Sequence, residues 1–202
     1  MQIIFEGPDC CGKTEIAKEL TRFLLEDLDS KADLPFPQYF KNGIEFDAFG
    51  GKQDYFRKAI VHEQSFITQF LQQTKYEAVF DRCYPSEYVY PRIFGRETIP
   101  SEEFWYIDEA WAFLGTIIIL PYRERYGDCN WDKDEYTEII DNIGKIHNLY
   151  IDFAERTSCH TIRLQVDSED LDDQINRIVA GIQCIMKSPD NTVHKMIMAE
   201  KR

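Results

Sequence analysis

A glycine-rich loop near the start of the chain constrains its fold more than any other segment. Residues 5–20 read FEGPDCCGKTEIAKEL, in which Gly7 and Gly12 are separated by four residues and followed directly by Lys13 and Thr14. This is the pattern G-x-x-x-x-G-K-[ST], whose glycines allow successive backbone N–H groups to turn toward a bound anion. A helix that begins at about Gly12 adds its own free N–H groups and the positive end of its dipole. The segment therefore predicts a phosphate-binding loop between a strand and a helix.

The two residues that close the loop indicate which phosphate compound binds. Lys13 is expected to reach the β and γ phosphates of ATP as a flexible point charge, and the Thr14 hydroxyl to bind the Mg²⁺ that accompanies the nucleotide. The adjacent Cys10 and Cys11 suggest metal or redox chemistry when taken alone, but within this spacing they are variable loop positions that fit because they are small. The predicted ATP-binding residues are Gly7, Pro8, Asp9, Cys10, Cys11, Gly12, Lys13 and Thr14.

Strand-like and helical segments alternate along the rest of the chain. Compact apolar runs predict strands, and apolar residues at helical spacing predict helices. Strands joined by helices form a parallel sheet covered on both faces, with ligands at the carboxyl ends of the strands. The sequence therefore predicts an α/β fold with about five parallel strands in a single domain over residues 1–202. The expected strands are 1–5, a short one near 34–36, 77–80, 116–120 and 161–166, and the expected helices are 13–25, 54–74, 101–114, 134–155 and 169–186.

Charge and composition restrict the partners and the location of the protein. The net charge of −13 repels a phosphate backbone, and only a short mixed tail at 194–202 is basic, so polynucleotide binding is not expected. The six cysteines show no zinc-site spacing, which indicates reduced thiols in a cytoplasmic protein. Glu6, Asp9 and Lys13 stand where a signal peptide would have its apolar core, and the longest apolar run, WAFLGTIIIL, has ten residues. Neither a signal peptide nor a membrane span is therefore expected.

A second anchor for the nucleotide lies in the segment EAVFDRCYPSEYVY. Asp81 follows a buried strand, so the sheet can bring its carboxylate close to Thr14, where it would hold Mg²⁺ or the water around the ion. Arg82 can face the phosphates as a bidentate donor. Motor ATPases usually place a glutamate at the position of Arg82, and the Asn-Lys-x-Asp sequence with which GTPases read their base is absent from the chain. Phosphoryl transfer to another small molecule is therefore favoured over hydrolysis.

Taken together, these motifs resemble those of thymidylate kinases. The shared features, in chain order, are G-x-D-x-x-G-K-T at 7–14, Phe36-Pro37 after the second strand, and D-R-x-x-x-S formed by Asp81, Arg82 and Ser86. The resemblance implies the three-layer fold of P-loop kinases with a lid. It also implies transfer of the γ-phosphoryl group of ATP to a deoxynucleoside monophosphate, above all dTMP or a related pyrimidine. A homodimer formed through the central helices is a further suggestion of the family.

The resemblance assigns several residues to the acceptor. Asp9 would bind the 3′-hydroxyl of the acceptor sugar, Phe56 would stack on its base, and Tyr90 would crowd its 2′ position so that a 2′-hydroxyl clashes. Phe36 would form a wall of the same pocket, and Arg82 would also contact the substrate. From the residues alone, Phe36 fits a strand end equally well, and Phe56 and Tyr90 fit ordinary core packing.

The segment PYRERYGDCNWDKDE follows the fourth expected strand, where kinases of this type carry their lid, at about 121–135. Arg123 and Arg125 could reach the transferring phosphoryl group and neutralise the charge that spreads over its oxygens in the transition state. Together with Lys13 and Arg82 they are the predicted catalytic residues. A solvated charged loop is the alternative interpretation of this segment.

Two positions depart from the thymidylate kinase pattern. The family usually has an arginine just before Phe-Pro, which holds the acceptor phosphate, and another arginine four residues after the stacking aromatic. This chain has Pro35 and Ile60 at these positions. The positive charge would then come from elsewhere, and the residues considered for it are Arg57, Lys58, Lys41 and Arg92.

Two other functions stay open at this point. Deoxynucleoside kinases share the fold, need no clamp for an acceptor phosphate, and have similar aromatic-rich segments. However, they carry Glu-Pro, whose glutamate is the base for the 5′-hydroxyl, where this chain has Phe36-Pro37. Asp9 also fits the monophosphate kinases better. The second alternative is a P-loop protein that binds nucleotide without transferring a group, against which the lid segment and the missing switch motifs argue.

Overall fold

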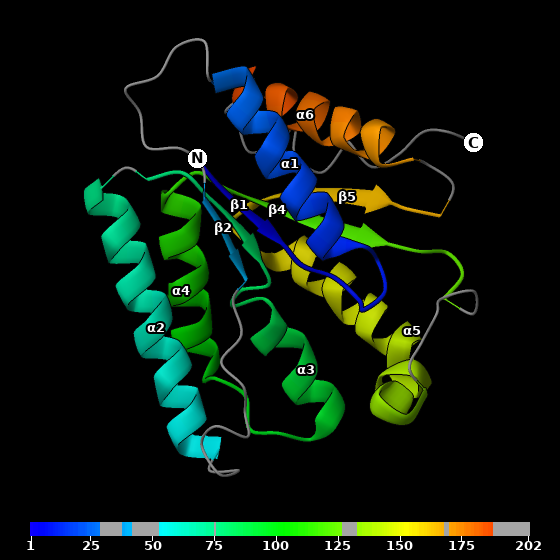
Figure 1. The fold of residues 1–202 in the computed structure, drawn as a ribbon. Coiled ribbons are helices and arrows are strands. Elements are labelled where there is room, and N and C mark those ends of the chain that lie inside the picture. The colour runs from blue at the N-terminus through cyan, green and yellow to red at the C-terminus, as the bar shows by residue number, and fades with distance from the viewer. Residues whose placement is uncertain (29–37, 42–52, 75, 127–132, 168–169, 188–202) are drawn as a thin grey trace.

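The computed structural model describes residues 1–28, 38–41, 53–74, 76–126, 133–167 and 170–187. Within these residues the centre of the fold is a sheet of five parallel strands in the order β2-β3-β1-β4-β5 (Figure 1). The predicted α/β fold with about five parallel strands is therefore confirmed. The strands are β1 (Gln2–Phe5), β2 (Gln38–Lys41), β3 (Ala78–Asp81), β4 (Thr116–Tyr122) and β5 (His160–Gln165).

Helices cover both faces of the sheet, which gives the three layers that the sequence predicts (Figure 1). One face carries α1 (Lys13–Leu28) and α6 (Leu171–Lys187). The opposite face carries α2 (Gln53–Thr74), α3 (Ser86–Phe94), α4 (Ser101–Phe113) and α5 (Lys133–Arg156). Within the described residues, none of these helices is both long enough and apolar enough to span a membrane.

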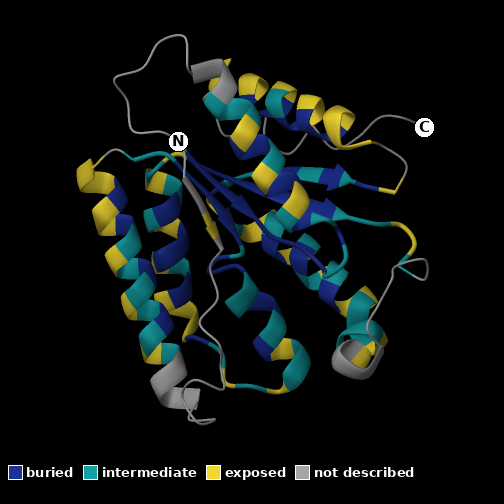
Figure 2. Cartoon of the chain, in the orientation of Figure 1, coloured by how far each residue is buried: buried dark blue, intermediate teal, exposed yellow. Residues whose placement is uncertain are grey.

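The central strands β1 and β4 are buried on both sides. Ile4 and Ile118 point into the core under α2 to α5, whereas Ile3 and Ile117 point into the core under α1 and α6. Because successive side chains of a strand alternate between the two faces, and both faces are covered here, the strands consist of continuous apolar runs. Figure 2 shows β1 and most of β4 as buried.

The second strand lies later in the chain than the sequence predicts. The expectation falls near 34–36, outside the described residues, whereas β2 begins at Gln38 and pairs in parallel with β3. Pro35 and Pro37 have no N–H group to donate to a neighbouring strand, so a regular strand is favoured only after them. Within β2, the Phe40 ring stacks on Phe80 of β3 with 5.4 Å between the ring centroids.

Helix α3 is not predicted by the sequence at all. Pro91 lies inside it, and a proline in a helix removes one hydrogen bond and crowds the preceding turn. The helix forms nevertheless because Tyr88 and Val89 are buried in the core on this face of the sheet. Gly95, with φ +62°, ends the helix by donating its N–H to the Pro91 carbonyl, and this glycine is the one signal of α3 in the sequence.

Candidate active site

The loop between β1 and α1 has the conformation that its glycines predict. Gly7 has a φ of +142°, and a Cβ added to it would lie 2.6 Å from the carbonyl oxygen of Pro121 in β4. Glycine is required here, because neither the backbone conformation nor the space admits a side chain. Gly12 and Cys10 have φ values of +67° and +59°, and α1 begins directly after the loop at Lys13. The loop therefore leads into the amino end of a helix, where anions bind.

The Lys13 side chain is buried within the loop. Its Nζ donates a hydrogen bond to the carbonyl oxygen of Pro8 at 2.6 Å. Burial, assisted by the positive charge of Arg82 and opposed by Asp9, lowers the pKa of Lys13 to about 8. An anion in the loop would favour the protonated lysine, because an opposite charge stabilises the charged form.

Thr14 and Asp81, the predicted Mg²⁺ ligands, meet at the edge of the sheet. Asp81 is the last residue of β3 and is paired in register with Phe5 of β1, which places it beside the first turn of α1. The Thr14 hydroxyl donates a hydrogen bond to Asp81 Oδ2 at 2.6 Å. A carboxylate and a hydroxyl fit Mg²⁺, which commonly takes one or two protein oxygens and fills its other positions with phosphate and water.

Three predicted acceptor residues form one hydrogen-bonded cluster. The Arg82 guanidinium pairs with Asp9 through Nη2 and donates to the Tyr90 hydroxyl through Nη1 at 3.0 Å. The Tyr90 hydroxyl donates in turn to Asp9 Oδ2 at 2.8 Å. Desolvation raises the pKa of Tyr90, so this phenol stays protonated and serves as a neutral donor. The structure therefore brings Asp9, Arg82 and Tyr90 together, and their roles toward an acceptor stay predictions.

Glu6 belongs to the same region, although the sequence reasoning did not select it. Its carboxylate is fully buried and accepts hydrogen bonds from the Cys83 N–H, the Ser86 hydroxyl and the Tyr150 hydroxyl. Burial raises the pKa of Glu6, and the charge of Arg82 opposes this. The signal in the sequence is a lone acidic residue between a buried strand and the first glycine of the loop.

The first part of the predicted lid lies against the phosphate-binding loop. Arg123 follows β4 and donates through Nε to the Cys10 carbonyl oxygen at 2.7 Å. The Tyr126 hydroxyl accepts the Arg123 N–H at 3.2 Å and lies 3.1 Å from His147 Nδ1 in α5. The Arg125 side chain is exposed, so the structure brings Arg123 but not Arg125 into contact with the loop. Residues 127–132 of the predicted lid lie outside the described residues.

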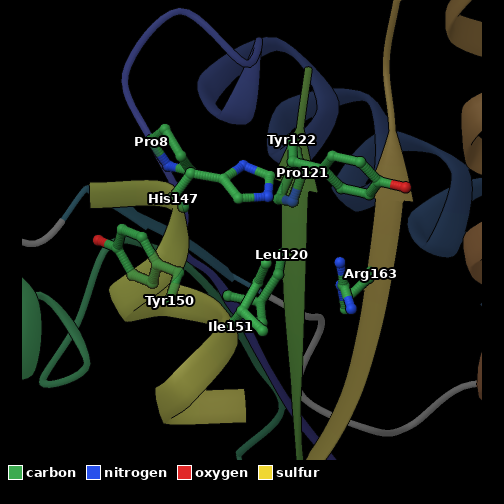
Figure 3. Close-up of a pocket in the computed structure, with 9 residues that line it drawn as sticks. Pro8, Leu120, Pro121, Tyr122, His147, Tyr150, Ile151 and Arg163 are labelled. Carbon is green, nitrogen blue, oxygen red and sulfur yellow. The ribbon is translucent and has the colours of Figure 1, made fainter. Parts of the chain in front are cut away.

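A small hollow lies where the loop meets β4, β5 and α5 (Figure 3). Figure 3 shows Pro8, His147 and Tyr122 close together on one side of it. The His147 and Tyr122 rings meet edge to face with 5.4 Å between their centroids. Burial lowers the pKa of His147, and the positive charge of Arg163 acts in the same direction, so the imidazole is mainly neutral at physiological pH. Uncharged aromatic side chains therefore pack beside Pro8 of the loop.

The remaining acceptor predictions have mixed outcomes. Phe36 lies outside the described residues, and Phe56 lies in α2 with a side chain that is not described, so both stay predictions. Among the cations considered for an acceptor phosphate, Arg57 pairs with Glu97 at 3.2 Å. Arg92 lies over the Tyr88 ring, with 3.8 Å from its guanidinium carbon to the ring centroid. Lys58 is exposed, and the side chain of Lys41 is not described.

The fold of this chain is similar to that of P-loop nucleoside monophosphate kinases. The YorR protein of Bacillus subtilis, solved with phosphorylated GDP, has a TM-score of 0.62 and 20% identity, covering 93% of this chain and 98% of its own. Thymidylate kinases from Ehrlichia chaffeensis and Candida albicans each have a TM-score of 0.52, with 16% and 11% identity. They cover 92% of this chain, and 98% and 92% of their own chains. The sequence matches no protein-family model and no curated protein.

Proposed function

We propose that this protein is a nucleotide kinase that transfers the γ-phosphoryl group of ATP to a deoxynucleoside monophosphate, preferably dTMP or a related pyrimidine nucleotide. The observation that carries the proposal is the cluster of Asp9, Arg82 and Tyr90 beside the phosphate-binding loop. Asp9 is itself part of the loop, so any group that it binds lies next to the phosphates of the donor. A carboxylate, a guanidinium and a phenol at this place suit the sugar and phosphate of an acceptor nucleotide.

The donor would be held by residues 7–14. Backbone N–H groups of the loop and the amino end of α1 bind the phosphate oxygens, and Lys13 exchanges its bond to the Pro8 carbonyl for a phosphate oxygen. Thr14 and Asp81 would hold Mg²⁺, which supplies positive charge to the phosphate oxygens. In this proposal the γ-phosphoryl group would lie at the end of the loop nearest Asp9.

The acceptor would then be oriented rather than activated. Its phosphate is already an anion, so no strong base is required for the attack. Asp9 would accept a hydrogen bond from the 3′-hydroxyl, Tyr90 would exclude a 2′-hydroxyl, and Arg82 would neutralise charge on the transferring group. Phe56 and Phe36 would hold the base. Arg123 would exchange the Cys10 carbonyl for a phosphoryl oxygen, and Arg125 would join it from the lid.

The test is ADP production by the purified protein with Mg²⁺ and ATP against a panel of acceptors. The panel contains nucleosides and nucleoside monophosphates in ribose and deoxyribose forms, including dTMP and GMP, and the products are separated and identified. Turnover of deoxynucleoside monophosphates supports the proposal. Turnover of nucleosides alone makes the protein a deoxynucleoside kinase, and ATP binding without turnover of any acceptor makes it a non-catalytic nucleotide-binding protein.

Two variants make this assay specific. Lys13→Met removes the phosphate-binding charge while keeping the length of the side chain, so loss of activity assigns the turnover to this protein. Tyr90→Phe keeps the ring but removes both hydrogen bonds of the hydroxyl, whereas Tyr90→Ala also removes the bulk. Only Tyr90→Ala should gain activity with ribonucleotides if the ring excludes the 2′-hydroxyl.

A homodimer is the proposed assembly, and the cytoplasm is the proposed location. Phe66 of α2 and Tyr106 and Phe113 of α4 are 71%, 72% and 78% exposed. These rings are large apolar groups on two neighbouring helices, which flank a groove lined by residues of both. A second copy of the chain could cover such a surface, because exposed apolar patches commonly mark interfaces.

A further inference from the structure

Glu6 links three parts of the candidate active site that are far apart in the chain. It lies between β1 and the phosphate-binding loop, and its side chain is fully buried. Oε1 accepts the Cys83 N–H at 2.5 Å, and Oε2 accepts the Ser86 hydroxyl and the Tyr150 hydroxyl, both at 2.9 Å. The carboxylate therefore joins the loop to the D-R-x-x-x-S segment and to α5.

Two hydrogen bonds to the backbone hold the turn that contains Arg82. Arg82 has a φ of +67°, a conformation that residues other than glycine rarely adopt unless their surroundings hold them in it. Its own N–H donates to the Phe5 carbonyl at 3.0 Å, and the N–H of the next residue, Cys83, donates to Glu6. Two consecutive N–H groups of the turn are thus bound by two consecutive residues, Phe5 at the end of β1 and Glu6 directly after it.

The direction of the Arg82 side chain follows from the direction of its backbone. In the observed conformation the guanidinium meets Asp9 and the Tyr90 hydroxyl. A turn that loses the bond from Cys83 to Glu6 can relax toward ordinary φ values, and the guanidinium would then move away from Asp9. Displacement of a substrate-orienting group by about 1 Å can cost 10²-fold in rate.

We propose that Glu6 is a positioning residue that holds Arg82 in its working conformation, while Ser86 and Tyr150 hold the Glu6 carboxylate. The inference rests on the proposed function, since Arg82 acts there on the transferring phosphoryl group. It also assigns a role to Ser86, the last residue of the D-R-x-x-x-S motif. The serine serves the site through Glu6 rather than through a contact of its own with nucleotide.

A second buried carboxylate, that of Asp108, provides a matched control for the loss of stability expected in Glu6→Gln. Asp108 in α4 is also fully buried, and it accepts the Tyr84 hydroxyl at 2.6 Å, the Ser158 N–H at 2.7 Å and the Thr157 hydroxyl. It ties α4 to the turn before β5 and to the Tyr84 side chain, but among the described residues it makes no hydrogen bond to the phosphate-binding loop or to the backbone N–H groups of Arg82 and Cys83. Glu6→Gln and Asp108→Asn therefore impose the same chemical change, since each amide keeps one acceptor oxygen and turns an NH₂ group toward donors.

The experiment measures steady-state kinetics and thermal stability of the wild type, Glu6→Gln and Asp108→Asn. We expect Glu6→Gln to lower kcat/KM for the acceptor by about 10- to 100-fold and to change KM for ATP by less than about twofold. Asp108→Asn should lose similar thermal stability with wild-type kinetics. Ser86→Ala and Tyr150→Phe, which each remove one donor to the carboxylate, should show smaller losses of the same kind. Equal kinetic effects of Glu6→Gln and Asp108→Asn would overturn the inference.

A double variant and a structural measurement complete the test. Glu6→Gln should have no further effect on kcat/KM in an Arg82→Ala background, whereas additive losses would show that Glu6 does not act through Arg82. Hydrogen exchange of the Cys83 amide should be at least about tenfold faster in Glu6→Gln and unchanged in Asp108→Asn. This readout needs no turnover. If the wild type phosphorylates no acceptor, the proposed function fails, while unchanged Cys83 exchange would refute the role of Glu6 itself.

Discussion

Replacement of Gly7 by alanine tests the close packing of the phosphate-binding loop on β4. The first cost is the backbone conformation, because a φ of +142° is rare for a residue with a side chain and such strain costs about 1–3 kcal/mol. The second is a Cβ at 2.6 Å from the Pro121 carbonyl oxygen, a backbone atom of a strand that is paired on both sides. We expect Gly7→Ala to lower the free energy of unfolding by about 3 kcal/mol or more.

Two other glycines separate these costs. Gly115 has a φ of +68° with open space around its Cα, so Gly115→Ala should show the backbone cost alone, about 1–2 kcal/mol. Gly144 in α5 has neither a positive φ nor a neighbour within 4 Å, so Gly144→Ala should raise the free energy of unfolding by about 0.5–1 kcal/mol. The assay is urea unfolding followed by circular dichroism, with ATP affinity measured by calorimetry.

The ranking of the three variants by free energy of unfolding and by ATP affinity tests this reasoning. Gly7→Ala should be the least stable and the only one of the three with weakened ATP binding, because its loop supplies the N–H groups for phosphate. If Gly7→Ala is as stable as Gly115→Ala and binds ATP like the wild type, the loop does not require the contact with Pro121, and the reasoning is refuted.

Three further predictions concern other parts of the molecule. Burial raises the pKa of Glu87 to about 7, so the folded state binds more protons than the unfolded state between about pH 4.5 and 7, and stability falls as pH rises through this range. Glu87→Gln should remove this loss, with a gain of about 1–2 kcal/mol at pH 8 that vanishes near pH 4, and parallel pH profiles for both proteins would contradict the assignment. Burial also raises the pKa of Cys159 to about 12, so in the native protein a thiol reagent should label the exposed Cys184 and spare Cys159, as peptide mass mapping would show. Phe113→Ser should shift the proposed dimer toward monomer in light scattering, and a wild-type mass equal to that of the monomer would reject that assembly.

The parts of the site that the sequence predicts are those fixed by local chemistry. Gly7 and Gly12 are required by the backbone of a single loop, and the pattern that contains them can be recognised without knowledge of the fold. Asp81 could be paired with Thr14 because parallel strands bring their carboxyl ends to one edge. These inferences need only short-range geometry and one general property of sheets.

The parts that the sequence does not predict depend on contacts between distant segments. In the sequence Glu6 looks like an isolated charge, because the residues that donate hydrogen bonds to it, Ser86 and Tyr150, lie in distant segments. Helix α3 forms despite Pro91 because burial of Tyr88 outweighs local preference. Gly95 marks where the helix ends, but that a helix forms there follows only from the packing of α3 on α5.

The close approach of Gly7 to Pro121 also has a consequence for synthesis of the protein. The phosphate-binding loop leaves the ribosome before β4, on which it packs. It also leaves before Arg82, which it meets through Asp9 and which lies more than seventy residues later in the chain. Protein domains fold as units after their parts have emerged. The nascent chain therefore cannot present a finished nucleotide site before residue 121 has been added, so tight nucleotide binding marks chains whose central strands have already assembled.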